Sequence, residues 1–407
     1  MTICINAAAA IKQPRTGVEE YSYQLIKYLT MLPEAREHRF LLYLPSEVRR
    51  TKEGVSCTNT RIGANDTNKR YFDFSLPPNF EIKVLRWPLP FLWTQIRLAW
   101  EMWRRKPDAL FIPVHVLPFG APGNSVVALH GLEYEYFPEH YPLWHRLFLR
   151  WSTKRALKRA RRMIAISENT KNDLVKLYGG KAEKISVVYH GIEKKYCLSE
   201  ELRSNSESNA VRGADPSTHP STSSGLAQGI NSPYLLYIGR VETKKNIQGI
   251  LEAYKILKEE YGIPHQLILA GAPGYGYKTL RHALRACLGD SIVELGYIDE
   301  AIKWRLLANA DIFLFPSFYE GFGLPVLEAQ AAGVPVVTSY GSCLPEIAGS
   351  GALFVNPQNP AQIAEAVKQI IDDKALRDKL IQLGYENIRS FSWDKCAKRT
   401  LEVIVKI

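Results

Sequence analysis

The chain has 407 residues, of which 46% are hydrophobic and 23% are charged. This composition is ordinary for a soluble globular protein, and the length is sufficient for two domains. No segment comes near the roughly 20 apolar residues that a membrane-spanning helix needs, so no such helix is predicted.

The net charge of +11 is concentrated in the first half of the chain. Residues 1–195 contain 31 Lys and Arg against 18 Asp and Glu, whereas residues 196–407 contain 21 against 23. A basic first half is compatible with nucleic acid, an anionic membrane surface or a phosphorylated substrate as a partner. Charge alone does not choose among these three.

Six cysteines are scattered along the chain without a C-x-x-C pair, and the histidines are not clustered in the sequence. This pattern predicts reduced thiols, no zinc site and a cytoplasmic location. Residues 1–5 are too short and too strand-like for the apolar region of a signal peptide.

The first half is predicted to alternate between strands and helices. Strands are expected at 2–6, 40–44, 109–113 and 125–129, with an amphipathic helix at 19–30. Residues 45–80 show no clean period and contain several turn formers, so this stretch is predicted to be irregular.

Residues 90–106 have helical spacing and end in three cations. Four large apolar residues fall close to one helical face: Leu92, Ile96, Trp100 and Trp103. Such a helix could dock at a membrane interface, or it could face the core with its cations complementing the helix dipole. We favour the core-facing interpretation because the strand that the helix would cover follows immediately, at 109–113.

A second basic helix is predicted at 145–162. Its cations recur every four residues: Arg146, Arg150, Lys154, Lys158 and Arg162. This stripe exceeds the usual solvated face of a helix. Contact with anionic lipid headgroups, contact with an acceptor diphosphate and simple solvation all stay open.

His130 directly follows the strand at 125–129. Ligands of open α/β sheets bind at the carboxyl ends of the strands, and histidine can exchange a proton near neutral pH. A structural histidine is the alternative.

Residues 198–233 are rich in Ser, Asn, Gly and Pro, which predicts a flexible insert. A strand at 234–238 then opens a second domain. Further on, a strand at 266–270 runs into Gly271, Gly274 and Gly276. Their spacing differs from the dinucleotide-binding G-x-G-x-x-G, and the ribose-binding acid expected about 20 residues later is absent. We interpret the loop at Gly271 as lining the nucleotide side of a cleft.

The most informative stretch runs from 316 to 328, after an apolar strand at 311–315. Pro325 fits the first position of a helix, so the preceding amides should gather at a helix N-terminus and attract an anion. These amides belong to Gly321, Phe322, Gly323 and Leu324. The two glycines let the backbone approach a ligand closely.

Two carboxylates bracket this loop: Glu320 enters it, and Glu328 lies one turn into the helix. Carboxylates are good acceptors for sugar hydroxyls. The arrangement suits a ligand with phosphate in the middle and polyols at both ends, which describes a nucleotide sugar. A buried strand, loop and helix with two solvated acids is the alternative.

The pattern E-x7-E around Gly-Phe-Gly-Leu-Pro, followed by Gly-Val-Pro-Val-Val, resembles the signature of retaining glycosyltransferases of family 4. The resemblance covers nearly the whole chain apart from 45–80 and 198–233. It implies the α/β GT-B architecture, in which two Rossmann-like domains face a central cleft. The donor is then held mainly by the second domain and the acceptor by the first.

The resemblance also assigns roles to residues. The string G-R-x-x-x-K-K-N at 239–246 matches the family segment, beginning at Gly239, whose Arg and Lys hold the donor diphosphate. Arg240 would bind the diphosphate in a bidentate manner and Lys245 would supply a point charge, with Lys244 as the competing candidate. These two cations would do the work of a divalent metal, which fits the lack of a D-x-D motif.

Three other segments are similar to family segments. Residues 130–139 resemble the H-D-L-x-F-x-x-x-P segment of the mannosyltransferase-like branch, which places His130 beside the donor sugar and acceptor, although Gly131 replaces the common aspartate. Residues 293–298 resemble the segment that meets the nucleobase, which includes Tyr297. Residues 15–18 resemble the glycine loop that faces the cleft, so Gly17 either contacts the donor or forms a plain left-handed turn.

The domains are therefore predicted as follows: an acceptor-binding domain at 1–195, an insert at 196–233, a nucleotide-sugar-binding domain at 234–390, and a helix at 391–407 that packs back toward the first domain.

The predicted reaction is transfer of a hexosyl group, with retention, from a nucleoside diphosphate sugar. GDP-mannose is favoured over a UDP-sugar, and the acceptor is a glycan or a polyprenyl-diphosphate-linked glycan in polysaccharide or lipopolysaccharide assembly. Glu320 would hold the sugar and Glu328 the ribose hydroxyls. We expect no metal cofactor, no nucleic-acid partner and a cytoplasmic enzyme, peripheral on the inner face of the membrane. A phosphorylase-like enzyme, or a membrane- or nucleic-acid-binding protein with a relict site, is the alternative.

Overall fold

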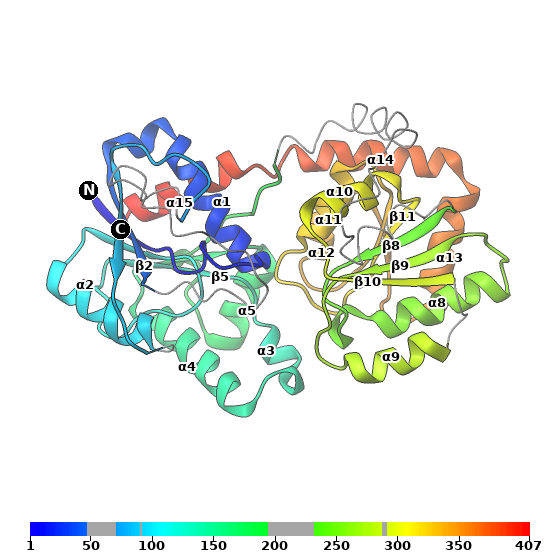
Figure 1. Cartoon of the computed structure of the whole chain (residues 1–407), viewed down its shortest axis with the longest axis horizontal. Helices are drawn as coiled ribbons and strands as arrows, with labels where there is room; N and C mark the ends of the chain where they lie inside the picture. The colour runs from blue at the N-terminus through cyan, green and yellow to red at the C-terminus, as the bar shows by residue number, and fades with distance from the viewer. Residues whose placement is uncertain (47–70, 90–91, 194–231, 287–290) are drawn as a thin grey trace, which may run out of the picture. The chain divides into compact units, whose positions relative to one another are not determined.

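The computed structural model describes residues 1–46, 71–89, 92–193, 232–286 and 291–407. These residues form two compact units, one of Met1–Gly191 with Trp393–Ile407 and the other of Ile192–Ser392 (Figure 1). Most of the stretch predicted to be irregular, and nearly all of the predicted insert, lie outside the described residues.

The first unit contains a seven-stranded parallel sheet in the order β3-β2-β1-β4-β5-β6-β7. Its strands are β1 (Thr2–Asn6), β2 (Arg39–Pro45), β3 (Phe80–Leu85), β4 (Ala109–Ile112), β5 (Ser125–Leu129), β6 (Arg162–Ala165) and β7 (Ile185–Val187). The strands predicted in this half are confirmed. The inner ones are mostly apolar and buried because helices cover both faces of the sheet.

The strand β3 begins at the end of the stretch that was predicted to be irregular, so that prediction is wrong at its boundary. β3 is an edge strand that pairs with β2, and most of its residues are only partly buried. It therefore lacks the continuous apolar run by which a buried strand is recognised.

The helices of the first unit come from its own part of the chain, apart from α15, which follows the second unit in sequence. The helical elements are α1 (Gly17–Met31), η1 (Pro33–Glu37), the π-helical turn η4 (Trp93–Leu98), α2 (Ala99–Arg105), α3 (Glu133–Tyr136), η5 (Pro138–His140), α4 (Leu143–Arg159), α5 (Glu168–Tyr178), η6 (Ala182–Lys184) and α15 (Trp393–Val405). The predicted basic helix ends before Arg162, which lies in β6, so Arg162 is not part of the cationic stripe.

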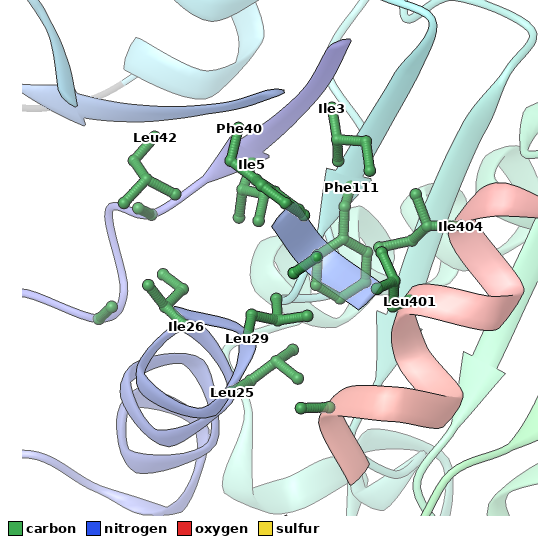
Figure 2. Close-up of a cluster of buried hydrophobic side chains, with 14 of the residues drawn as sticks. Ile3, Ile5, Leu25, Ile26, Leu29, Phe40, Leu42, Phe111, Leu401 and Ile404 are labelled. Atoms are coloured by element: carbon green, nitrogen blue, oxygen red, sulfur yellow. The ribbon is translucent and has the colours of Figure 1, made fainter. Parts of the chain in front are cut away.

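The sheet of the first unit has a separate hydrophobic core on each face. On one face, residues of α1 and α15 pack against the strands (Figure 2). Leu25 and Leu29 of α1 and Leu401 and Ile404 of α15 belong to this cluster. The last helix of the chain is thus part of the core of the first unit.

The opposite face of the sheet is covered by α2 and α4. Leu98 and Met102, from η4 and α2, and Ala156 and Ala160, from α4 and its end, belong to the second cluster. In Figure 1, α2 and α4 accordingly lie on the other side of this sheet from α1 and α15.

The predicted helix at 90–106 faces the opposite way from our expectation. The segment packs against the sheet, as the core-facing interpretation predicted. Leu92, Ile96, Trp100 and Trp103 are exposed, however, so the face that we assigned to the core is wrong. The segment begins with a π-helical turn, which changes the angle between successive residues, and the buried side instead carries Trp93, Leu98, Ala99 and Met102. Both sides are apolar, so periodicity could not tell which one meets the sheet.

The second unit contains a six-stranded parallel sheet in the order β10-β9-β8-β11-β12-β13. Its strands are β8 (Tyr234–Ile238), β9 (Gln266–Ala270), β10 (Ile292–Gly296), β11 (Ile312–Phe315), β12 (Val336–Ser339) and β13 (Ala352–Val355). Its helices are η8 (Thr243–Lys245), α8 (Ile247–Glu259), α9 (Tyr277–Ala286), α10 (Glu300–Asn309), α11 (Leu324–Ala331), α12 (Leu344–Ala348), α13 (Pro360–Asp372) and α14 (Lys374–Ile388).

Both sheets have the strand order of a doubly wound fold, as predicted. The order reverses between β1 and β4 in the first unit and between β8 and β11 in the second. Loops that leave neighbouring strands in opposite directions create a crevice at such a point, and ligands bind there. Within the described ranges, no helix has both the length and the apolar content needed to cross a bilayer.

Replacing Ile404 by alanine should destabilise the first unit. Ile404 is fully buried in the cluster of Figure 2, so the change leaves a cavity that costs about 2–5 kcal/mol in the free energy of unfolding. Urea denaturation followed by tryptophan fluorescence measures this loss. The neighbouring Val405, which is exposed, provides the matched control, and Val405→Ala should change stability by less than about 0.5 kcal/mol. Equal losses in the two variants would contradict the packing of α15.

Candidate functional site

The loops after β8, β9 and β10 touch one another through glycine backbone. Gly239 and Gly271 have φ of +156° and +151°, and a Cβ on Gly271 would lie 1.8 Å from the carbonyl oxygen of Gly239. The amide of Gly239 donates to Ala270 O at 2.9 Å, and that of Gly271 donates to Gly296 O at 2.7 Å. Glycine at 271 is therefore required by this close approach, which positions the start of the segment that carries Arg240.

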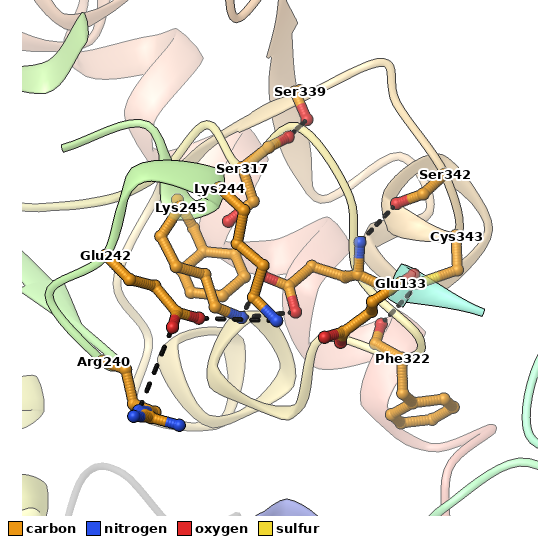
Figure 3. Close-up of polar contacts among 12 residues, drawn as sticks. Glu133, Arg240, Glu242, Lys244, Lys245, Ser317, Phe322, Ser339, Ser342 and Cys343 are labelled. Atoms are coloured by element: carbon orange, nitrogen blue, oxygen red, sulfur yellow. Dashed lines mark hydrogen bonds and ion pairs between the residues drawn. The ribbon is translucent and has the colours of Figure 1, made fainter. Parts of the chain in front are cut away.

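Arg240 follows β8 and has a side chain that is 63% exposed (Figure 3). Its Nε lies 4.0 Å from Oε2 of Glu242, a buried carboxylate whose Oε1 is 3.4 Å from Nζ of Lys244. Lys244, the competing candidate, is thus turned toward Glu242. Arg240 keeps most of its guanidinium accessible to a ligand.

Lys245, which is partly buried, and Glu320, which is buried, form an ion pair. The Nζ atom of Lys245 lies 2.5 and 2.6 Å from the two carboxylate oxygens of Glu320. Lys245 is at the end of η8, after β8, and Glu320 follows β11, so the pair joins the two loops at the topological switch point. Two residues predicted from separate motifs, 75 positions apart, are in direct contact.

The loop after β12 holds Glu320 in place. The amide of Glu320 donates to Oγ of Ser342 at 2.9 Å, and Ser342 has a φ of +53°, which is costly for a residue other than glycine. The buried thiol of Cys343 lies 3.2 Å from Glu320 O and 3.0 Å from Phe322 O (Figure 3). Burial raises the pKa of Cys343, so it stays a thiol that can donate to these carbonyls.

The predicted helix N-terminus after this loop is confirmed. Helix α11 begins at Leu324, with Pro325 in its first turn and Gly323 as the N-cap at a φ of +97°. Phe322 is buried and packs edge-on against Phe391, with 6.0 Å between ring centroids. Anion binding by the amides of this turn stays a prediction.

Glu328 is held by a lysine that sequence analysis missed. Nζ of Lys303, in α10, lies 2.7 Å from Oε1 of Glu328 and 2.9 Å from Oε2 of Glu300. Burial lowers the pKa of Lys303, but the two carboxylates outweigh it and raise the pKa above the ordinary value. The carboxylate of Glu328 therefore has a fixed position in α11. Tyr297, directly after β10, is exposed.

His130 and Gly17 belong to the first unit. Nε2 of His130 lies 2.7 Å from Pro113 O, and the ring packs edge-on against Tyr21. Burial, with a smaller contribution from His115, lowers the pKa of His130 to about 3. This shift favours the neutral ring and opposes the expectation that His130 exchanges a proton near neutral pH.

Gly17 is the first residue of α1, and its φ is not in the left-handed region. The interpretation of Gly17 as a left-handed turn is therefore wrong. No atom lies within 4 Å of a Cβ built at this position, so nothing in the fold of the first unit demands glycine.

Several residues that support the site gave no separate signal in the sequence. Glu242 lies inside the G-R-x-x-x-K-K-N string at 239–246. Its position between Arg240 and Lys244 in the sequence could have indicated that it pairs with them. Ser342, Cys343 and Lys303 reach the site from other loops and helices, and only the folded chain reveals them.

Comparison with known families agrees with this architecture. Residues 15–196 match the family described as Glycosyltransferase Family 4, and residues 226–387 match the family described as Glycosyl transferases group 1. Together the two matches cover most of the chain, one in each unit.

Two relatives act in O-antigen synthesis according to their names. O-antigen chain mannosyltransferase B of Escherichia coli is 29% identical over 406 residues, which is 98% of each chain. O-antigen chain mannosyltransferase RfbU of Salmonella typhimurium is 23% identical over 363 residues, or 87% of each chain.

Solved structures show the same fold. HepE of Anabaena, in complex with UDP and glucose, has a TM-score of 0.67 at 17% identity and covers 100% of this chain and 99% of its own. Sucrose-phosphate synthase of Thermosynechococcus elongatus has a TM-score of 0.71 at 18% identity, covering 100% and 98%. The fold is therefore GT-B, and the chain is a transferase that belongs to glycosyltransferase family 4, the group 1 glycosyltransferases.

Proposed function

We propose that this glycosyltransferase moves a mannosyl group from GDP-mannose to a glycan or a polyprenyl-diphosphate-linked glycan, with retention of anomeric configuration. The observation that carries the proposal is the Lys245–Glu320 pair beside the exposed Arg240, at the reversal of strand order in the second unit. Similarity to O-antigen chain mannosyltransferase B along nearly the full length supports the sugar and the acceptor class.

Arg240 and Lys245 bind the donor diphosphate. Negative charge grows on its oxygens as the glycosidic bond breaks, and fixed cations beside these oxygens stabilise this charge. Arg240 is reachable from solvent, and Lys245 is oriented by both oxygens of Glu320. These two cations do the electrostatic work of a divalent metal, so activity should not require one.

The other donor contacts follow from the positions of the carboxylates. Glu328, fixed by Lys303, accepts hydrogen bonds from the ribose hydroxyls, and Glu320 accepts from a hydroxyl of the sugar. The amides from 321 to 324 bind phosphate or sugar oxygens at the start of α11. Tyr297, Gly239 and Gly271 line the nucleotide, and the loop at Gly17 approaches the donor from the first unit.

Retention proceeds without a covalent intermediate. The carboxylate of Glu320 is bound through both oxygens to Lys245, which makes it a poor nucleophile. The bond from the anomeric carbon to the diphosphate breaks, and the acceptor hydroxyl attacks the same face. Its proton passes to the departing diphosphate oxygen.

The neutral His130 contributes a hydrogen bond to the sugar or acceptor rather than a proton. The reaction belongs to the assembly of a cell-surface polysaccharide or lipopolysaccharide. The enzyme works in the cytoplasm, peripherally bound to the inner face of the membrane.

Arg240→Ala should abolish the binding of GDP and lower mannosyl transfer about 100-fold or more, the scale of losing one donor to transition-state charge. Calorimetric titration with GDP and then UDP, in the presence of a chelator, measures the binding. Lys245→Ala should lower turnover by a similar factor.

Arg305→Ala is the matched control, because Arg305 is an exposed arginine on α10 and does not belong to the loops after β8 and β11. It should bind GDP as the wild type does. A near-normal rate in the double Arg240→Ala, Lys245→Ala variant would contradict the proposal that these residues bind the donor diphosphate. If the wild type bound neither nucleotide, or bound UDP alone, the proposed donor would be wrong.

Glu328→Ala should raise the KM for the donor about 10-fold and leave kcat nearly unchanged, because the ribose is bound equally in ground and transition states. Lys303 retains Glu300 as a partner in this variant, so the fold should persist. Steady-state kinetics with varied GDP-mannose measures both constants. A collapsed kcat at unchanged KM would instead place Glu328 in the chemical step.

The first unit should lose stability as the pH falls from about 6.5 toward 4. Burial lowers the pKa of His130 to about 3 and that of His115 to about 4, whereas both groups take up protons near 6.5 in the unfolded chain. Each therefore favours the unfolded state by about 2 kcal/mol on going from pH 7 to pH 5. His130→Gln should reduce the acid loss, measured by urea denaturation at both values, by that amount. An unchanged loss in the variant would show that His130 is not held neutral.

A further inference from the structure

Helix α4 presents a stripe of large apolar side chains to solvent. Trp144 is 82% exposed, and the other members are also exposed. The stripe consists of Leu143, Trp144, Leu147, Phe148 and Trp151. Positions 144, 147, 148 and 151 lie on one face of a helix. Single exposed apolar residues are normal on a protein surface, whereas a continuous stripe marks an interaction site.

The segment η4–α2 presents a second stripe. Trp103 is 71% exposed, and Leu92, Ile96 and Trp100 are exposed with it, at the spacing of one helical face. These are the residues that were expected to meet the sheet. The π-helical turn η4 places Trp93 in the core, and the face that carries Leu92, Ile96, Trp100 and Trp103 is left exposed to solvent.

The two stripes lie on the same side of the first unit. Both helices pack against the same core cluster, on the face opposite α1 and α15. Gln95 of η4 binds the main chain at Leu117 and Phe119, at 3.3 and 3.0 Å, and Arg155 of α4 donates to Leu117 O at 2.9 Å. Phe119 is exposed and its ring centroid lies 5.5 Å from that of Trp151. We call the two stripes together with Phe119 the aromatic surface.

Cations accompany the aromatic surface. The 17 residues of α4 include six Lys and Arg and no Asp or Glu. Lys154, Lys158 and Arg159 of α4, and the three cations at the end of α2, are exposed. Two acidic side chains in and beside these helices are paired with cations. Glu101 pairs with Arg97 and Arg105, and Glu135 pairs with Arg150. Arg150 is therefore not available to an external anion.

The apolar and cationic side chains of this surface together indicate which class of partner it binds. Tryptophans with aliphatic residues and flanking Lys and Arg suit the boundary between acyl chains and anionic headgroups. A nucleic acid would leave the leucine and isoleucine side chains without an apolar partner. In a symmetric dimer through this surface, the same cations of both copies would meet each other.

We propose that the aromatic surface docks the enzyme on an anionic lipid bilayer. The tryptophans and aliphatic side chains insert at the level of the headgroups, and Lys154, Lys158 and Arg159 bind lipid phosphates. The inference rests on the membrane contact included in the proposed function, and it specifies the surface and the lipid charge.

The test is cosedimentation of the full chain with vesicles of phosphatidylcholine alone and of phosphatidylcholine with an equal part of phosphatidylglycerol. The wild type should bind only the anionic vesicles, and added salt should weaken binding. Trp144→Ser with Phe148→Ser, and separately Trp103→Ser, should each lower the affinity about 10-fold or more, since buried apolar area is lost. Lys154→Gln with Lys158→Gln should do the same through lost attraction to headgroups.

The matched control replaces exposed apolar residues on the opposite side of the same unit. Met31 of α1 is 56% exposed and Val405 of α15 is also exposed, so Met31→Ser with Val405→Ser should bind vesicles as the wild type does. Equal losses in control and stripe variants, or no loss in the stripe variants, would overturn the assignment of this surface. A dimer that the stripe variants dissociate, without vesicle binding by the wild type, would assign the surface to a second copy instead.

Measurements of GDP binding and mannosyl transfer show whether a negative result overturns the membrane docking or the proposed reaction. The Trp144→Ser with Phe148→Ser variant and the Trp103→Ser variant should bind GDP and transfer mannose to a detergent-dispersed acceptor at the wild-type rate, because none of the changed residues belongs to the candidate site. Wild-type transfer without vesicle binding would overturn the docking alone. Vesicle binding without GDP binding would overturn the proposed reaction and leave the docking intact.

Discussion

The ion pair between Lys245 and Glu320 is the contact on which the arrangement of the second unit's site depends. The side chains of Lys245 and Glu320 are only 14% and 7% exposed, so each charge relies on the other for compensation. The pair links the loop after β8 to the loop after β11. Around it, Ser342 and Cys343 fix the backbone of Glu320, and Glu242 engages the neighbouring cations. The positive charge of Lys245 is therefore already oriented in the folded chain.

Sequence analysis identified the parts of this site that short segments encode. The buried strands, the helix that begins before Pro325, and the candidate residues Arg240, Lys245, Glu320 and Glu328 all stand in runs whose chemistry is local. Both Rossmann-like units follow from the same alternation of strands and helices. The contact between Lys245 and Glu320 was not predicted, although both residues were.

The sequence did not reveal which distant side chains contact one another or which face of a helix is buried. Lys303 is 25 positions from Glu328, and nothing in the spacing of α10 singles it out. The neutrality of His130 results from burial beside Tyr21 and His115, which depends on three separate segments. The helix after position 92 was oriented wrongly because large apolar residues occupy both of its sides. Such a helix can be oriented only when the sheet that it covers is known.

The last helix has a consequence for how the protein is made. Leu401 and Ile404 complete a core whose other walls come from β1, β2 and α1, near the start of the chain. While the ribosome synthesises the second unit, the first has an open apolar face where α15 will lie. Domains usually fold in the order of synthesis. Here the unit whose synthesis begins first is completed only after the second unit, when α15 is made, so its apolar face stays open in the nascent chain until then.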